Sequence, residues 1–248
     1  MNLQSLETPS LVLDVERMQG NAERLAKRVS ELGARLRPHI KTHKCIEVAR
    51  IQNGGRAGPI TVSTLAEARA FVAHGFTDIT YAVPIEPGKF PAAIEIAKSC
   101  ERLSLLTDDA EIPLLLNDAA QMAGVSLDLV VKIDCGYHRC GVEPDSSAAL
   151  KIPRLICGLG NLRFAGILTH AGHSYLCHTK DERLGVARHE RDVMVELAAR
   201  LRQSGIEVPV VSIGSTPTIT AVDHLNSYWK EMRSLTAGQF RGGGSGSL

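Results

Sequence analysis

Polar and cationic side chains recur directly after short β-rich runs of this sequence, where parallel strands would end. The first run leads into HIKTHK, the fifth into DCGYHR, the sixth into THAGHSY and the seventh into GSTPT. In an α/β barrel the carboxyl ends of the strands meet at one face, and enzymes with this fold build their active sites there. These segments therefore predict one shared site that combines an amine, a guanidinium, imidazoles and hydroxyl groups.

Lys41 is the candidate nucleophile of this site. A lysine that is held among cationic groups and partly removed from water has a lowered pKa, which favours Schiff-base formation with a carbonyl compound. Arg37, His43 and Lys44 supply the neighbouring positive charge. A surface lysine in a basic stretch would have the same neighbours, so both interpretations of Lys41 stay open at this point.

The turn Gly214-Ser215-Thr216 is a candidate phosphate site. A turn between a strand and a helix offers backbone N–H groups and hydroxyls to an anion, with the positive helix end behind them. Ser and Thr also cap helices where no ligand is present, and for this turn alone capping is the stronger interpretation. Ser63 and Thr64 follow the second β-rich run, and Thr64 is included among the cofactor-binding candidates.

The segment HAGHSYLCH is the one place where the sequence suggests a metal. It holds His170, His173, Cys177 and His178, and imidazole and thiolate suit zinc. No second Cys or His pair follows at a spacing known from zinc sites. We therefore predict no metal ligand in this chain.

The elements that must position these residues alternate between short β-rich runs and longer segments of helical period. This alternation is typical of a parallel sheet covered by helices. Strands are predicted at 34–41, 59–63, 78–83, 102–106, 128–134, 163–169 and 208–213, with an eighth near 231–236. Their number and spacing predict a barrel of eight strand-helix units of the (β/α)8 TIM type. No GxGxxG follows the first strand to favour an open nucleotide-binding sheet.

Helices are predicted where apolar residues recur at three and four positions, at 15–33, 63–75, 91–100, 110–124 and 183–205. Gly33, Gly75, Gly124 and Gly205 stand where four of them should stop. One domain over 1–238 is the simplest division, because no linker interrupts the pattern. Residues 239–248 form a glycine- and serine-rich tail.

Composition narrows the classes of partner. The chain has 248 residues and 44% hydrophobic residues, enough for one large buried core. Lys and Arg number 28 and Asp and Glu number 27, so the net charge is close to zero. The chain therefore has no strong overall electrostatic field that would favour binding to nucleic acid or to an anionic membrane surface. A small-molecule partner is expected. The N-terminus resembles neither a secretion signal nor a membrane anchor, so we expect a cytoplasmic protein whose six cysteines are thiols.

Five segments taken together resemble the D-threonine aldolase and D-serine dehydratase group, which belongs with the alanine racemase N-terminal barrel. They are RPHIKTHK, ITVSTLAEARAF, VKIDCGYHRCGV, GILTHAGHSY and VVSIGSTPT, in the right order between about Thr8 and Arg233. The resemblance implies a barrel that binds pyridoxal 5'-phosphate, and a homodimer. It implies a lyase that acts on β-hydroxy-D-amino acids.

The resemblance also implies roles for single residues. Lys41 would hold the cofactor as a Schiff base, and Arg139 would lie beside the cofactor ring. His170 and Tyr175 would line the pocket, and Gly214, Ser215 and Thr216 would bind the phosphate. From the residues alone, His170 could equally be a core histidine and Tyr175 a packing aromatic. We expect a structural role for Asp134 and a solvated position for Glu67.

The resemblance breaks after Arg233, where the family continues into a C-terminal β-domain and this sequence reads SLTAGQFRGGGSGSL. That domain carries the family's divalent-metal ligands, so these ligands are expected to be absent here. We also expect the altered last strand to leave strands one and seven without a full partner. The motifs favour a D-threonine aldolase-like reaction. A D-serine dehydratase-like reaction, or a truncated cofactor-binding protein with little activity, are the alternatives.

Overall fold

The computed structural model describes residues 3–10, 12–222, 224–225 and 235–237. All eight strands belong to one parallel sheet, in the order β1-β8-β7-β6-β5-β4-β3-β2. They are β1 Arg35–Leu36, β2 Ile60–Val62, β3 Asp78–Pro84, β4 Arg102–Thr107, β5 Leu127–Lys132, β6 Leu162–Leu168, β7 Val211–Ser212 and β8 Leu235–Ala237. A single parallel bridge between His39 and Thr61 joins the two edges of this sheet. The predicted parallel sheet covered by helices is confirmed.

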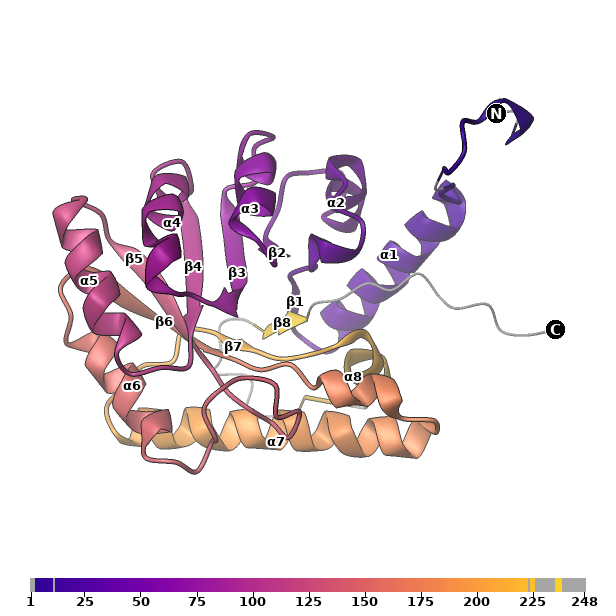
Figure 1. Ribbon diagram of the computed structural model, residues 1–248. Helices are drawn as coiled ribbons and strands as arrows, with labels where there is room; N and C mark the ends of the chain where they lie inside the picture. The colour runs from indigo at the N-terminus through magenta and orange to yellow at the C-terminus, as the bar shows by residue number, and fades with distance from the viewer. Residues whose placement is uncertain (1–2, 11, 223, 226–234, 238–248) are drawn as a thin grey trace.

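The helices lie outside the strands, and α7 runs along the outer side of the last strands (Figure 1). They are α1 Val15–Glu31, α2 Ile46–Gln52, α3 Leu65–Val72, α4 Phe90–Ala97, α5 Ile112–Met122, α6 Ala148–Cys157, α7 Lys180–Gln203 and α8 Thr216–Ala221. Short 3-10 turns occur at η1 Leu3–Ser5, η2 Ile40–Thr42, η3 Pro87–Lys89 and η4 Gly172–Leu176. The four glycines predicted to stop helices all have positive φ angles, as a left-handed helix end requires.

The core is formed by the strands and the inner faces of the helices. All six residues of β5 are buried, because helices cover one face of the sheet and the barrel interior encloses the other. Gly166 in β6 allows β7 to approach closely: its φ is +134°, and a Cβ there would collide with the carbonyl oxygen of Val210. The register between β5 and β6 shifts next to this glycine.

The eighth strand differs from our expectation. β8 is only three residues long, yet it pairs with both neighbours: Thr236 faces Arg35 of β1 and Ser212 of β7. The expectation that strands one and seven have no full partner is therefore only partly wrong: residues of the altered segment supply the pairing, but β8 pairs with only two residues of each strand. Residues 231–234 of the predicted strand and the predicted tail at 239–248 lie outside the described residues.

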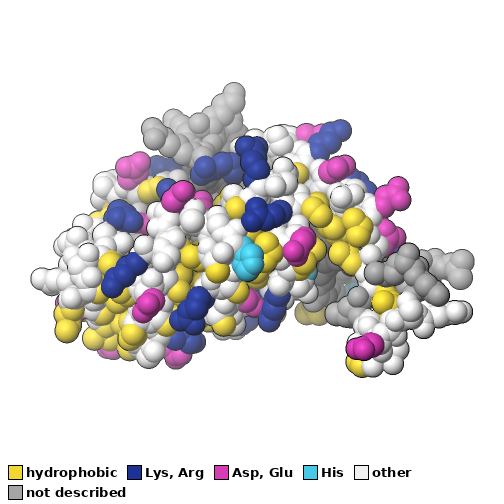
Figure 2. Space-filling model, turned by 90° about the horizontal axis from the view of Figure 1, so that it is seen from above, with side chains coloured by type: hydrophobic (Ala, Val, Ile, Leu, Met, Phe, Trp, Pro, Cys, Tyr) yellow, Lys and Arg dark blue, Asp and Glu magenta, His cyan; other side chains and the backbone are white. Residues whose placement is uncertain are grey.

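The surface carries charges of both signs. Figure 2 shows Lys and Arg side chains interspersed with Asp and Glu over one face of the molecule, as the near balance of charge predicts. Within the described residues, no helix combines the length and the apolar character needed to cross a membrane. All six cysteines are free thiols.

Candidate functional site

A cavity of about 360 Å³ opens at the carboxyl ends of the strands, as predicted for the active site. This volume falls in the range of small-molecule sites. Its walls come from the ends of six strands and the loops after them. They include Arg37, His39, Lys41, Thr61, Ser63, Lys132, Arg139, Cys140, Thr169, His170, Ser212 and Gly214. A second cavity of about 250 Å³ adjoins it and shares Lys41, Arg139 and His170 with it. We call the two together the upper cavity.

Lys41 lies in the 3-10 turn η2 and not at the end of a strand. The predicted strand 34–41 is too long, because β1 ends at Leu36 and Pro38 follows. The η2 turn is held at its start by His39, whose Nδ1 accepts a hydrogen bond from the backbone N–H of Lys41 at 3.3 Å. His39 in turn is anchored by its bridge to Thr61 of β2. The turn therefore brings Lys41 into the upper cavity although it is off the strand.

The upper cavity is strongly cationic. Arg37, Lys41, Lys132 and Arg139 line it, and no carboxylate is among its described lining residues. Burial is the main cause, and the charges of Lys41, His170 and Arg139 contribute, in lowering the pKa of His39 to about 3. Burial likewise lowers the pKa of His170 to about 4. Both imidazoles are therefore neutral near pH 7, and the cavity suits an anionic ligand.

Hydrogen bonds fix the tautomers of both histidines. His39 accepts at Nδ1, so its proton is on Nε2, which faces Ser63 Oγ at 3.4 Å. His170 Nδ1 lies 3.3 Å from the carbonyl oxygen of Gly214, so Nδ1 carries the proton there. Nε2 of His170 is left as an acceptor, and the hydroxyl of Ser63 is left to donate to a ligand.

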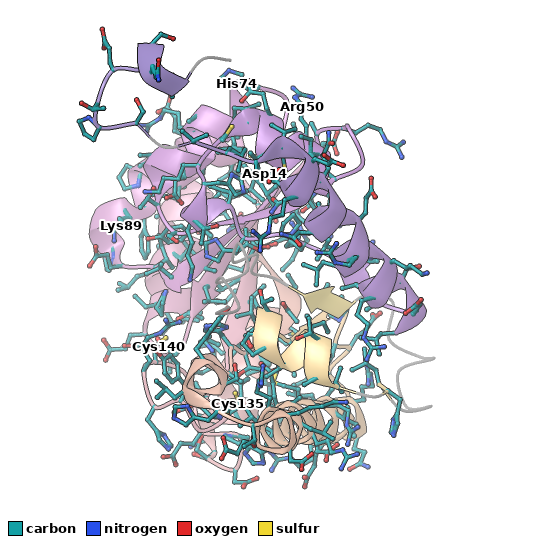
Figure 3. All side chains as sticks on the ribbon, turned by 90° about the vertical axis from the view of Figure 1, so that its right-hand side faces the viewer. Asp14, Arg50, His74, Lys89, Cys135 and Cys140 are labelled. Carbon is teal, nitrogen blue, oxygen red and sulfur yellow. The ribbon has the colours of Figure 1, made fainter. Side chains whose placement is uncertain are left out.

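The loop after β5 places Arg139. Asp134 caps this loop: its Oδ1 accepts the N–H groups of Gly136, Tyr137 and His138, and its Oδ2 lies 2.9 Å from His138 Nδ1. The predicted structural role of Asp134 is confirmed. The Arg139 guanidinium lies over the ring of Tyr137, with its carbon 5.1 Å from the ring centroid. Figure 3 shows where Cys135 and Cys140, from the same loop, lie on the ribbon.

The loop after β6 packs against Tyr137. A Cβ on Gly172 would overlap the Tyr137 ring, so only glycine allows this contact. The rings of Tyr137 and His170 meet edge to face, with centroids 6.1 Å apart. Tyr175 lies on the other side, 6.5 Å from the His170 ring, and borders the smaller part of the upper cavity. The structure thus brings Lys41, Arg139, His170 and Tyr175 together.

The turn Gly214-Ser215-Thr216 is only partly available to a ligand. The N–H of Gly214 donates to Glu190 Oε1 at 3.1 Å, and the N–H of Ser215 donates to Thr218 Oγ1 at 2.9 Å. The Ser215 hydroxyl is buried in the α8 cap and against Ser174. Thr216 differs: its Oγ1 is buried and has no hydrogen-bond partner within the described part of the chain. Gly214 lines the upper cavity, and Thr216 is two residues further along the same turn.

Thr64 is the candidate that the structure places away from the upper cavity. Its hydroxyl accepts the N–H of Glu67 and caps α3, and the preceding residue, Ser63, lines the cavity in its place. Glu67 is buried and not solvated, since its carboxylate accepts the N–H groups of Ser63 and Thr64 and pairs with Lys44.

Sequence reasoning missed two buried charged residues. Lys132 lines the upper cavity at the end of β5, and its Nζ donates to the carbonyl oxygen of Ile133 at 2.9 Å. Burial lowers its pKa. Glu190 of α7 accepts the N–H groups of Ala171 and Gly214 with one oxygen, and burial raises its pKa. Lys132 stands in the segment VKIDCGYHRCGV, whereas nothing in the helical pattern of α7 distinguishes Glu190.

Residues 13–233 match the family model described as alanine racemase, N-terminal domain. The chain belongs to this family. Among members of known activity, D-threo-3-hydroxyaspartate dehydratase of Delftia sp. (strain HT23) is 39% identical over 224 residues, which are 90% of this chain and 59% of that protein. Its solved structure superposes with a TM-score of 0.87, with 38% identity, over 94% of this chain and 61% of that one.

Two further relatives have related names. D-serine dehydratase of Dictyostelium discoideum is 34% identical over 235 residues, which are 90% of this chain and 59% of that protein. The crystal structure of D-threonine aldolase from Filomicrobium marinum superposes with a TM-score of 0.83 and 29% identity, over 95% of this chain and 62% of that one. The chain thus spans about three fifths of the length of these relatives.

The alanine racemase N-terminal barrel of this chain offers no metal site among the described residues. They contain no cluster of three or more His, Cys, Asp or Glu side chains with the geometry for a metal ion.

Proposed function

We propose that this chain binds pyridoxal 5'-phosphate in the upper cavity through Lys41, as the cofactor-binding barrel of a lyase that acts on 3-hydroxy-D-amino acids. One observation carries the proposal: the amine of Lys41 borders a cavity that is lined by four cationic side chains, two neutral imidazoles and no described carboxylate. A phosphorylated aldehyde needs an amine to bind covalently and positive charge to hold its phosphate.

The residues present fit this cofactor. The unpaired Thr216 Oγ1, two residues after Gly214, supplies a hydroxyl for the phosphate, and the cationic field of Arg37 and Lys132 attracts it. Arg139 is held over Tyr137, where its guanidinium can meet either the cofactor ring or the carboxylate of the amino acid. Neither Ser215 nor Thr64 takes part in this proposal, because both hydroxyls serve as helix caps.

The bound cofactor would supply an electron sink for the α-carbon of the substrate. The chain's own residues would accept and donate the protons that the reaction moves. Lys41 Nζ, once free of the cofactor, is placed to accept a proton. His170 Nε2 is an unprotonated acceptor that borders the same cavity, and the Ser63 hydroxyl is a donor held by His39. These three groups would give the cavity a base, an acceptor and a donor.

We propose elimination of the 3-hydroxyl group as the first reaction to test. The motifs alone favoured retro-aldol cleavage. The relative with 39% identity is a D-threo-3-hydroxyaspartate dehydratase, and one with 34% identity is a D-serine dehydratase, which supports dehydration more strongly. Retro-aldol cleavage is the second candidate, supported by the D-threonine aldolase structure.

Covalent trapping of the cofactor tests the proposal. The chain mixed with pyridoxal phosphate should absorb visible light as a protonated Schiff base does, and borohydride should fix the cofactor to the peptide that contains Lys41. Lys41→Ala should abolish both signals. Lys44→Ala is the matched control and should keep both, because Lys44 pairs with Glu67 and does not line the cavity.

The outcome against the proposal is clear. A labelled peptide that contains Lys44, or no lysine of the segment HIKTHK, would place the cofactor elsewhere. Activity is tested separately, with D-threo-3-hydroxyaspartate, D-threonine and D-serine in the presence of a divalent metal. One solved structure of the Delftia dehydratase is of a mutant in the metal-free form, which supports adding metal.

A further inference from the structure

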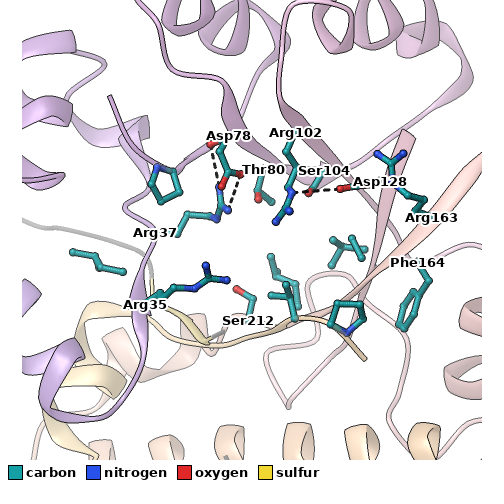
Figure 4. A pocket seen from close by; sticks show the side chains of 17 residues that line it. Arg35, Arg37, Asp78, Thr80, Arg102, Ser104, Asp128, Arg163, Phe164 and Ser212 are labelled. Carbon is teal, nitrogen blue, oxygen red and sulfur yellow. Dashed lines mark hydrogen bonds and ion pairs between the residues drawn. The ribbon is translucent and has the colours of Figure 1, made fainter. Parts of the chain in front are cut away.

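A third cavity, of about 240 Å³, lies toward the amino ends of the strands (Figure 4). Arg35, Asp78 and Arg102, which line it, are the first residues of β1, β3 and β4. We call it the lower cavity. Barrel enzymes place their chemistry at the other end of the strands, so the proposed lyase function does not explain it. One water needs only about 10–15 Å³ of such space. The lower cavity is large enough for a small ligand.

The charges that line the lower cavity do not balance. Among the described residues, four arginines and two aspartates line it, which leaves two positive charges. Both carboxylates are already engaged: Asp78 with Arg37 at 2.8 Å, and Asp128 with Arg163 at 2.6 Å and Arg102 at 3.7 Å. The Arg35 guanidinium has neither an ion pair nor a hydrogen bond to any described residue.

Three of the arginines that carry the excess positive charge extend into the lower cavity. Figure 4 shows the guanidinium groups of Arg35, Arg37 and Arg102 extending toward it, the first two from β1 and the residue after it and the third from β4. Burial lowers the pKa of Arg37; Asp78 opposes this, but the charges of Arg102 and Arg35 lower the pKa further. The arginines therefore repel one another across the cavity, and an anion between them would remove this repulsion.

Hydroxyl groups complete the lining. Thr80, Ser104 and Ser212 also border the lower cavity, where barrels usually place large branched side chains that fill the interior. A purely structural network of arginines and aspartates would be expected to pair its charges and fill its space. Guanidinium groups and hydroxyls around a hollow are instead what recognises phosphate or carboxylate oxygens.

We propose that the lower cavity is a binding site for a small oxyanion, held by Arg35, Arg37 and Arg102. The ligand class is a phosphate or a dicarboxylate, since several guanidinium groups can meet two or more negative oxygens at once. The lower cavity shares Arg37 and Ser212 with the upper cavity, whereas Arg35 and Arg102 line only the lower one, and the proposal does not depend on the proposed function.

The test is titration with inorganic phosphate and, in parallel, with succinate, at constant ionic strength set by chloride. Isothermal titration calorimetry measures the affinity, and phosphorus NMR line broadening reports phosphate binding directly. Each titration is run with and without saturating pyridoxal phosphate. Binding in the lower cavity should be saturable and should survive cofactor addition, because the two sites lie at opposite ends of the strands.

The variants separate the lower cavity from the rest of the surface. Arg35→Gln should weaken anion binding by about tenfold, because it removes a charge-assisted donor. Arg154→Gln is the matched control: Arg154 is an exposed arginine on α6 and should leave the affinity unchanged. Asp128→Asn should tighten binding several-fold, because it frees Arg102 and Arg163 from the carboxylate they share.

A gain of affinity in Asp128→Asn is the discriminating result. In a network that serves only stability, this variant would lower the melting temperature and change no ligand affinity. Absence of saturable binding of either anion, binding that pyridoxal phosphate displaces, or equal affinity in Arg35→Gln and the wild type would each overturn the proposal. Arg35 is exposed and has no ion-pair partner among the described residues, so Arg35→Gln should fold normally.

Discussion

At the scale of single residues, the upper cavity keeps two histidines neutral. Burial and nearby cations lower the pKa of His39 from 6.5 to about 3 and that of His170 to about 4. In the unfolded chain both imidazoles take up protons below about pH 6.5. The unfolded state therefore binds more protons than the folded state between pH 6.5 and about 4, and the free energy of unfolding must fall as the pH falls through this window.

We expect a loss of up to about 1.4 kcal/mol per pH unit for each of the two histidines. Urea unfolding at a series of pH values between 7 and 4 measures it. His39→Asn should reduce the slope, because it removes one titrating group and keeps an acceptor for the N–H of Lys41. His74→Gln, at an exposed histidine, is the control and should leave the slope unchanged. A slope that is the same in His39→Asn and the wild type would contradict the assigned cause.

Thr216 and Ser215 are neighbours with different expected roles. Thr216→Val keeps the shape of the side chain and removes the unpaired hydroxyl, so it should weaken pyridoxal phosphate binding by about tenfold, the effect of a hydrogen bond to a charged group. Ser215→Ala removes a helix cap and should lower the free energy of unfolding by about 1 kcal/mol. Fluorescence titration with the cofactor and urea unfolding separate the two effects. Equal loss of cofactor affinity in both variants would show that Thr216 has no special role.

Single residues were predictable from the sequence where a motif fixed them. Lys41, Arg139, His170 and Gly214 all line the upper cavity, while their cofactor-binding roles stay predictions. The sequence could not show that Thr64 and Ser215 cap helices and do not bind the cofactor. A serine or threonine at the start of a helix has the same sequence pattern whether it caps the helix or binds a ligand. The two N–H groups expected to face a phosphate, at Gly214 and Ser215, are bonded within the protein.

At the scale of elements, α7 positions two loops of the upper cavity through one side chain. Glu190 Oε1 accepts the N–H of Ala171, after β6, at 2.9 Å and the N–H of Gly214, after β7, at 3.1 Å. Glu190→Ala would leave both buried amides without a partner, at a cost of about 1–3 kcal/mol for each. We expect a matching loss in the free energy of unfolding, together with weaker cofactor binding.

Glu190→Gln is the control for this prediction. Its amide oxygen can still accept both hydrogen bonds, and burial already disfavours the charged form of Glu190. Gln should therefore change stability by less than about 1 kcal/mol, a cost well below that of unpaired amides. Urea unfolding and cofactor titration measure both variants. Equal destabilisation by Gln and Ala would mean that the charge, and not the two hydrogen bonds, holds the loops.

Long elements were predictable and short ones were not. The helical period located α1, α3, α4, α5 and α7, and glycines marked four of their ends. Three helices were missed. α2 has seven residues and α8 has six, too few for a periodic pattern, and α6 contains Pro153, which usually argues against a helix interior. β1 was predicted too long because Pro38 was not taken as a limit on regular strand pairing.

At the scale of the whole molecule, closure of the barrel depends on β8. This strand has three residues and pairs with β1 and β7, the strands that precede η2 with Lys41 and the Gly214 turn. Thr236→Pro would remove an N–H from the middle of β8, at a cost of about 3 kcal/mol. We expect a melting temperature roughly 6–12 °C lower, and weaker cofactor binding.

Thr236→Val keeps the N–H and a β-branched side chain, and should melt within about 2 °C of the wild type, as expected for a change well below 1 kcal/mol. Thermal unfolding followed by circular dichroism checks both variants. A Thr236→Pro variant that melts with the wild type would show that the barrel does not need β8. The eighth strand predicted near 231–236 overlaps β8 at Leu235 and Thr236, but its pairing with two distant strands could not be obtained from the sequence, because that pairing is a property of the closed sheet.

One carboxylate oxygen of Glu190 accepts two hydrogen bonds, and this has a consequence for local unfolding. The amide protons of Ala171 and Gly214 are 43 residues apart in the sequence, yet both are protected from solvent by the same acceptor. A movement of α7 that withdraws this acceptor releases both amides at once, because neither has another acceptor in the described part of the chain. The loops after β6 and β7 should therefore open as one cooperative unit, and hydrogen exchange at the two amides should share one opening free energy.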